Sequence, residues 1–206
     1  MGCSPNDQQV EYEEQTFLNL CLNQNEIRSK RFYECDFIDC DLSEAIFSNC
    51  RFIECKFAEC NLSLVKLKNS SFVNTYFENS KVIGVNWREA SWPTVELFCP
   101  IEFFRCDLSH SAFFGLSLRA IRLTECLAKD VDFREADLTE ADLTHTDFTG
   151  SLFMETNLTR ADFSDAIHYH IDVGFNKVKA ARFTLPEAVS LLRSLDIEIV
   201  DDATPL

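Results

Sequence analysis

A bulky apolar residue recurs at every fifth position along almost the whole chain of 206 residues. The first run is Tyr12, Phe17, Leu22, Ile27, Phe32, Phe37, Leu42, Phe47, Phe52, Phe57, Leu62, Leu67, Phe72, Phe77, Val82, Trp87 and Trp92. After a slip of one residue, the second run is Phe98, Phe103, Leu108, Phe113, Leu118, Leu123, Ala128 (a skip), Phe133, Leu138, Leu143, Phe148, Phe153, Leu158 and Phe163. A helix needs a spacing of three to four and a strand a spacing of two, so the period predicts neither alone.

A second series of small residues stands two positions before the bulky ones. It includes Cys35, Cys40, Ala45, Cys50, Cys55, Cys60, Cys106, Ser111, Cys126, Ala136, Ala141, Ser151, Ala161 and Ala166. The residue between the two series is often Asp or Asn, whose short side chain bonds neighbouring backbone and suits a corner. Four five-residue sides close a square coil of about 20 residues, and coils stacked about 4.8 Å apart bury a continuous core.

This A-D/N-L-x-x pattern, from about Phe17 to Val173, resembles the pentapeptide repeat family. The resemblance implies an all-β fold, a right-handed quadrilateral β-helix of about eight coils that is about 40 Å long. We expect a flexible lead over residues 1–11, the β-helix over 12–183 with a register break at 93–100, and a dimerisation segment and tail over 184–206.

The break in register follows two tryptophans. Trp87 and Trp92 stand where Phe and Leu are usual, and because an indole is large for a narrow coil we expect a widened corner or partly exposed rings. Pro93 has no N–H to donate, which ends regular pairing. We expect a bulge, a short loop or a bend here, either a tolerated irregularity of the repeat or a recognition feature.

The segment after the repeats has a different pattern. Thr184 and Glu187 form a capping-box motif, which predicts a helix from about Leu185 to Ser194, followed by a short strand at 197–200. The helix would cap the open end of the solenoid, and its surplus apolar surface predicts a symmetric homodimer. The candidate dimerisation residues are Leu185, Val189, Leu191, Leu192, Leu195, Ile197 and Ile199.

The formal net charge is −15, and residues 129–165 hold ten acidic side chains against three basic ones. An acidic field repels nucleic acid and anionic membranes and attracts proteins that bind DNA. We interpret Asp137, Asp142 and Asp162 as turn formers. Glu135 and Glu155 are separated by one predicted coil and are expected to stack on one face. The candidate partner-binding acidic face comprises Glu135, Glu155, Glu140, Asp165 and Asp130.

The sequence predicts no enzyme, no metal and no cofactor. Most cysteines occupy the small inward site, where free Cys packs as a small hydrophobe, and none has zinc-ligand spacing. His168 and His170 have no third ligand nearby, and no constellation of catalytic residues is present. No apolar stretch is long enough to span a bilayer, and the start lacks the regions of a secretory signal, so we expect a cytoplasmic protein.

Four segments outside the repeat pattern carry a second resemblance: GVNWREASWP (84–93), FFGLSL (113–118), HYHID (168–172) and RFTLPEAVSLLRSLDIEI (182–199). They resemble the topoisomerase-poison resistance branch of the family, most of all its albicidin-resistance members, alongside Qnr-type and microcin-immunity proteins. This resemblance implies a homodimeric, DNA-like acidic rod, joined through its C-termini, that binds DNA gyrase or topoisomerase IV and relieves poisoning by a toxin or drug.

Two alternatives remain open. One is a structural or scaffolding repeat protein for an unrelated partner, because the fold by itself sets no function. The other is direct sequestration of a drug by the region of Trp87 and Trp92, which requires a concave pocket.

Overall fold

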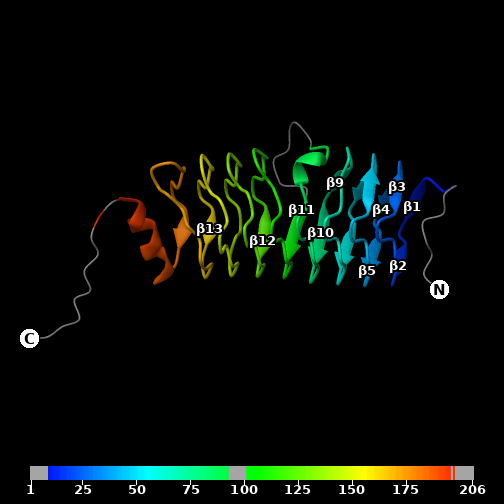
Figure 1. Cartoon of the computed structure of the whole chain (residues 1–206), viewed down its shortest axis with the longest axis horizontal. Coiled ribbons are helices and arrows are strands. Elements are labelled where there is room, and N and C mark those ends of the chain that lie inside the picture. Colours follow the sequence, from blue (N-terminus) through cyan, green and yellow to red (C-terminus); the bar gives the residue numbers. More distant parts are fainter. Residues whose placement is uncertain (1–8, 93–100, 196, 198–206) are drawn as a thin grey trace, which may run out of the picture.

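The chain winds into a rod of stacked coils, with the two termini at opposite ends (Figure 1). The computed structural model describes residues 9–92, 101–195 and 197. Its strands are β1 (Glu11–Glu13), β2 (Thr16–Leu18), β3 (Glu26–Arg28), β4 (Arg31–Tyr33), β5 (Asp36–Ile38), β6 (Ile46–Ser48), β7 (Arg51–Ile53), β8 (Lys56–Ala58), β9 (Ser71–Val73), β10 (Thr75–Glu78), β11 (Ile101–Phe104), β12 (Arg122–Thr124), β13 (Asp162–Phe163) and β14 (Arg182–Phe183). Two 3-10 helices, η1 (Trp87–Glu89) and η2 (Glu187–Leu195), complete the described elements.

The strands pair only in parallel, each with the strand one coil further along the chain. Phe17 of β2 pairs with Phe37 of β5, and Asp162 of β13 pairs with Arg182 of β14, so one coil comprises four five-residue repeats in both cases. The sheets have the orders β1-β4-β7-β9, β2-β5-β8-β10-β11-β12, β3-β6 and β13-β14. These pairings confirm the predicted all-β solenoid, which has about eight turns.

Each corner of the coil depends on two residues rather than one. The residue two positions after a bulky residue adopts a left-handed backbone, as at Glu14 with φ 51° and Glu135 with φ 59°; we call it the corner residue. The Asp before the bulky residue closes the same turn from the other side: the Asp137 carboxylate accepts hydrogen bonds from the N–H and the hydroxyl of Thr139. Asp142 and Asp162 make the same pair of bonds, which confirms their prediction as turn formers.

The core is a set of side-chain columns that run along the rod. Phe57 stacks between Phe37 and Phe77, with ring centroids 4.6 and 5.0 Å away. The small inward residues also bond the backbone: the Cys60 thiol donates to the carbonyl of Phe37, and the Cys60 N–H donates to the hydroxyl of Ser80. Cysteine, serine and threonine at these sites therefore link successive coils as well as filling space.

The register break lengthens one coil. Lys81 pairs with Asp107, whereas a coil of four regular repeats would bring position 101 beside it. The expected bulge, loop or bend at 93–100 lies outside the described residues. Of the two alternatives for the tryptophans, the partly exposed ring is wrong for Trp87, which is 1% exposed because its indole packs against Phe77, Phe103 and Phe113. Trp92 is partly exposed, and its indole N–H donates to the carbonyl of Trp87 at 2.8 Å.

The predicted C-terminal helix is present as η2, which closes the far end of the rod (Figure 1). The predicted capping box is wrong. Thr184 accepts a hydrogen bond from the N–H of Asp165 at 2.9 Å, and Glu187 accepts one from the N–H of His168 at 2.7 Å. Because backbone donors at the open end of a solenoid have no further coil to bond, these side chains cap the last coil instead of the helix. The strand expected at 197–200 falls almost entirely on residues that are not described.

Candidate functional site

The five residues predicted to form one acidic face are corner residues on different sides of the rod. Asp130, Glu135, Glu140, Glu155 and Asp165 all have left-handed φ. A coil of four repeats has four corners, so residues one repeat apart lie on successive corners. Glu135 and Glu155 share a corner column, as expected. Asp132 pairs with Leu152, which places residues one coil apart at the same corner. The other three do not share it, and the single-face prediction is wrong: the C-terminal half of the rod is acidic on several sides.

Neighbouring cations divide these acids into two groups. The contacts are Glu140 with Arg160 at 3.2 Å, Asp130 with His110 at 3.7 Å and Asp165 with His145 at 3.9 Å. Glu135 and Glu155 form no ion pair within the described residues. The acids without a Lys or Arg partner are therefore the exposed corner residues Asp130, Glu135, Glu155 and Asp165, which remain available to an external cation.

Acids at the turn-forming position are already satisfied inside the protein. The hydrogen-bonded guanidinium of Arg134 holds the pKa of Asp132 below its ordinary value. Partial burial raises the pKa of Asp162, but hydrogen bonds from Ser164 and the nearby Arg182 outweigh it, and the net shift is downward. These carboxylates are ionised and internally bonded, so they hold turns together rather than offering a free contact.

A second acidic column, missed by the sequence reasoning, lies in the N-terminal half. Glu14, Glu34 and Glu54 are corner residues one coil apart, and their N–H groups bond the carbonyls of successive coils in the same way. All three are exposed, and none forms an ion pair within the described chain. The signal was present in the sequence as three glutamates at the coil period, two positions after Tyr12, Phe32 and Phe52.

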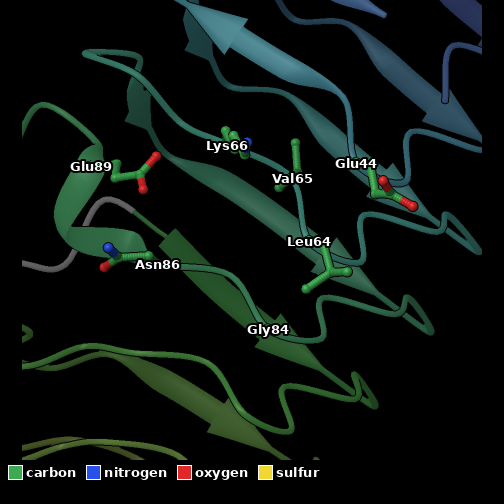
Figure 2. A pocket seen from close by; sticks show the side chains of 7 residues that line it. All are labelled: Glu44, Leu64, Val65, Lys66, Gly84, Asn86 and Glu89. Atoms are coloured by element: carbon green, nitrogen blue, oxygen red, sulfur yellow. The ribbon is translucent and has the colours of Figure 1, made fainter. Parts of the chain in front are cut away.

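A groove of about 340 Å³ lies beside η1 (Figure 2). Its lining residues are Glu44, Leu64, Val65, Lys66, Gly84, Asn86 and Glu89. In Figure 2, Glu89 stands on η1 at one side and Glu44 lies toward the other, with Val65 and Lys66 between them. We call this feature the shoulder groove. Neither tryptophan lines it, and Trp87 is enclosed in the core, which removes the physical basis for drug capture by that ring.

Apolar side chains are exposed at the C-terminal end. Leu185 is 78% exposed, and Val189, Leu192, Leu195 and Ile197 are also exposed. Leu191 is partly buried and packs against the core, and its place in a dimer interface stays a prediction. Ile199 lies outside the described residues. Leu152, Met154 and Phe175 add exposed apolar surface in the last coils.

Among residues 9–92, 101–195 and 197, no group of three or more His, Cys, Asp and Glu side chains is placed to hold a metal ion. No helix in the described part of the chain has the length and apolar character needed to cross a bilayer.

Comparisons with known proteins agree with this geometry. A family model described as a pentapeptide repeat region matches residues 30–99, and one described as pentapeptide repeats matches 117–153 and 132–167. The chain belongs to the pentapeptide repeat family. Proteins of this family are typically structural or binding proteins rather than enzymes.

Two solved structures illustrate the likeness. HetL, a pentapeptide repeat protein involved in heterocyst differentiation regulation from the cyanobacterium Nostoc, is 14% identical over 86% of each chain, with a TM-score of 0.68. A trypsin-treated QnrB1, a plasmid-mediated fluoroquinolone resistance protein, is 18% identical over 93% of this chain and 98% of its own, with a TM-score of 0.59. At these identities the likeness concerns the fold. No curated protein matches the sequence at a significant level.

Proposed function

We propose that this protein binds DNA gyrase or topoisomerase IV in the cytoplasm and protects the enzyme from a toxin or drug, as its resemblance to albicidin-resistance, Qnr-type and microcin-immunity proteins implies. The observation that carries the proposal is the arrangement of unpaired corner acids, Glu14, Glu34 and Glu54 at one end and Glu135 and Glu155 at the other. Such columns would attract a partner protein that binds DNA, because the DNA-binding surface of that partner is basic.

The spacing of these columns supports a DNA-like contact. Successive coils place corner carboxylates about 4.8 Å apart. One strand of duplex DNA carries a charge about every 3.4 Å. A single column is therefore a sparser row of charge than a phosphate backbone, so binding by charge alone would be weak. Additional contacts are required for affinity and for choice of partner.

The exposed apolar end supports the dimer in this proposal. A face with Leu185, Val189 and Leu192 in water favours burial against a second copy, and a symmetric dimer joins two identical faces. Two rods joined at η2 would be about 80 Å long, estimated from the coil spacing. Sedimentation should show a dimer that Leu192→Asp converts to monomer, whereas Leu18→Asp, at an exposed leucine near the other end, should leave the dimer intact.

The test of the function is a gyrase supercoiling and cleavage assay with several poisons, including albicidin and a fluoroquinolone. The wild-type protein should restore supercoiling or reduce trapped cleavage for at least one poison. A variant with Glu135→Lys and Glu155→Lys should weaken gyrase binding and its salt dependence. The matched control carries Glu125→Lys and Glu140→Lys, two corner acids already paired with Arg105 and Arg160.

If both double variants weaken binding equally, net charge and not the unpaired column governs recognition. Unchanged supercoiling and unchanged poison sensitivity at saturating wild-type protein would contradict the proposal. Enrichment of an unrelated protein without gyrase subunits in a pull-down would favour the scaffolding alternative, because one fold serves many functions.

A further inference from the structure

Leu64 combines an unfavourable backbone conformation with an exposed apolar side chain. It is a corner residue with φ 59°, in the left-handed region that disfavours most side chains. Its side chain is 54% exposed, so burial of the side chain does little to offset the backbone strain. Before the register break, the other described corner residues are Glu, Asn, Asp, Gln, Ser or Gly. Strained residues of this kind occur preferentially at functional sites.

The next coil is adapted to this leucine. Gly84 lies one coil away in the same corner column, and a Cβ atom there would come within 2.6 Å of Leu64 Cδ2. Gly84 has φ 68°, which glycine adopts without strain. The absence of a side chain at Gly84 leaves room for Leu64 to lie over the corner, at the edge of the shoulder groove (Figure 2).

Two carboxylates line the groove together with this leucine. Glu44 and Glu89 line the groove on opposite sides, and both are exposed (Figure 2). Neither forms an ion pair in the described part of the chain; Glu44 accepts only a hydrogen bond from Gln24 at 3.3 Å. One cation, Lys66, lines the same groove. The lining therefore combines an exposed aliphatic anchor with a net negative charge.

We propose that Leu64 and the shoulder groove form the specific docking point for a topoisomerase segment in which an apolar side chain is flanked by Lys or Arg. This inference rests on the proposed function and supplies the contact that sparse acidic columns lack. The charges select the occupant: cations beside the apolar side chain would pair with Glu44 and Glu89, whereas an acidic peptide or a nucleic acid would meet two unpaired carboxylates.

The decisive variant is Leu64→Asn, because asparagine tolerates a left-handed backbone better than leucine. If Leu64 serves binding, this change should weaken the affinity for purified gyrase by about tenfold or more while the melting temperature stays the same or rises. The matched control is Leu18→Asn, at a leucine that is also exposed but lies in β2 with an ordinary backbone. It should leave gyrase affinity unchanged.

The outcomes separate the two proposals. Gyrase binding by the wild type that Leu64→Asn leaves intact would overturn the docking point and leave the proposed function standing. A fall in melting temperature together with lost affinity would indicate that Leu64 supports the fold, and would also overturn it. If the wild type binds neither purified gyrase nor purified topoisomerase IV, both proposals are overturned. A variant with Glu44→Gln and Glu89→Gln should weaken binding at low salt and flatten its salt dependence, and an unchanged salt dependence would contradict the basic character of the partner segment.

Discussion

The two halves of the rod follow the same backbone path with different side-chain chemistry. Before the register break, two columns are aromatic, as in the stack of Phe32, Phe52 and Phe72, and the small sites often hold cysteine. After it, one column becomes Leu118, Leu138 and Leu158, and alanine is common at the small sites. The first half contains most of the three-residue strands, whereas the second half is joined largely by isolated bridges.

The difference shows that a coil is stabilised in two ways. Stacked rings and short parallel strands link the coils of the first half. In the second half, Asp or Asn before the bulky residue closes the turn by bonding the N–H and hydroxyl two residues on. The two solutions are not exclusive, since Asp41 and Asn61 make the same turn in the first half. The share of the stability that comes from stacked rings and strands decreases along the rod, and the share that comes from turn hydrogen bonds increases.

The largest expected effect comes from emptying a column in each half. Phe57→Ala should lower the free energy of unfolding by about 4 kcal/mol, and Leu138→Ala by about 3 kcal/mol, because both side chains are fully buried and phenylalanine fills more volume. Denaturant unfolding followed by circular dichroism measures both. A greater effect of Leu138→Ala would show that the stacked rings do not make the first half the more stable one.

Exchanging the core residues sharpens the same comparison. Phe57→Leu keeps an apolar side chain but removes the stacked pairs with Phe37 and Phe77, so we expect a loss of about 1 to 1.5 kcal/mol. Leu138→Phe should also destabilise, because an added ring overpacks a column built for leucine. If Leu138→Phe leaves the unfolding midpoint unchanged or raises it, the second half has space for an aromatic column and its leucines are not required by packing.

A turn-forming aspartate tests the chemistry of the second half. Asp137→Ala leaves the N–H of Thr139 without its acceptor and should lower the free energy of unfolding by about 1 kcal/mol. Asp36→Ala, at the equivalent position in strand β5, should change it by less than about 0.5 kcal/mol because that side chain makes no such turn in the described structure. Asp137→Asn keeps an acceptor oxygen and serves as the control. Equal effects of Asp137→Ala and Asp36→Ala would show that the turn bonds add nothing.

Most of the fold follows from the period of five, because each coil repeats one local interaction. The alternation of small and bulky inward residues predicts the square coil, and the aspartates at 137, 142 and 162 act as turn formers as predicted. The site is harder to predict, because it depends on which residues share a column. Residues one repeat apart look adjacent in the sequence but lie on successive corners. Of the five predicted acids, only Glu135 and Glu155 therefore share a column, whereas Glu14, Glu34 and Glu54 align.

The remaining errors occur where the repeat ends or is interrupted. Trp87 is buried because neighbouring phenylalanines surround it on several sides, and this packing is not visible in local sequence. Thr184 and Glu187 match a helix-capping pattern, yet they bond the last coil because its N–H groups have no other acceptor. In both places contacts distant in the sequence override a local preference.

The smallest expected effect is a dependence on pH in the second half. The folded pKa of Asp162 lies below its ordinary value, so its contribution to stability is complete above about pH 4, the unfolded value, and is lost as the pH falls through the folded pKa. Asp132 and Asp147 are shifted in the same direction. Asp162→Asn keeps an acceptor oxygen for the N–H of Ser164, just as Asn61 accepts a hydrogen bond from the N–H of Ser63. The asparagine amide cannot be protonated in this pH range. The loss of unfolding free energy between pH 6 and pH 3 should therefore be smaller in the variant. A loss equal to that of the wild type would show that acid acts elsewhere in the rod.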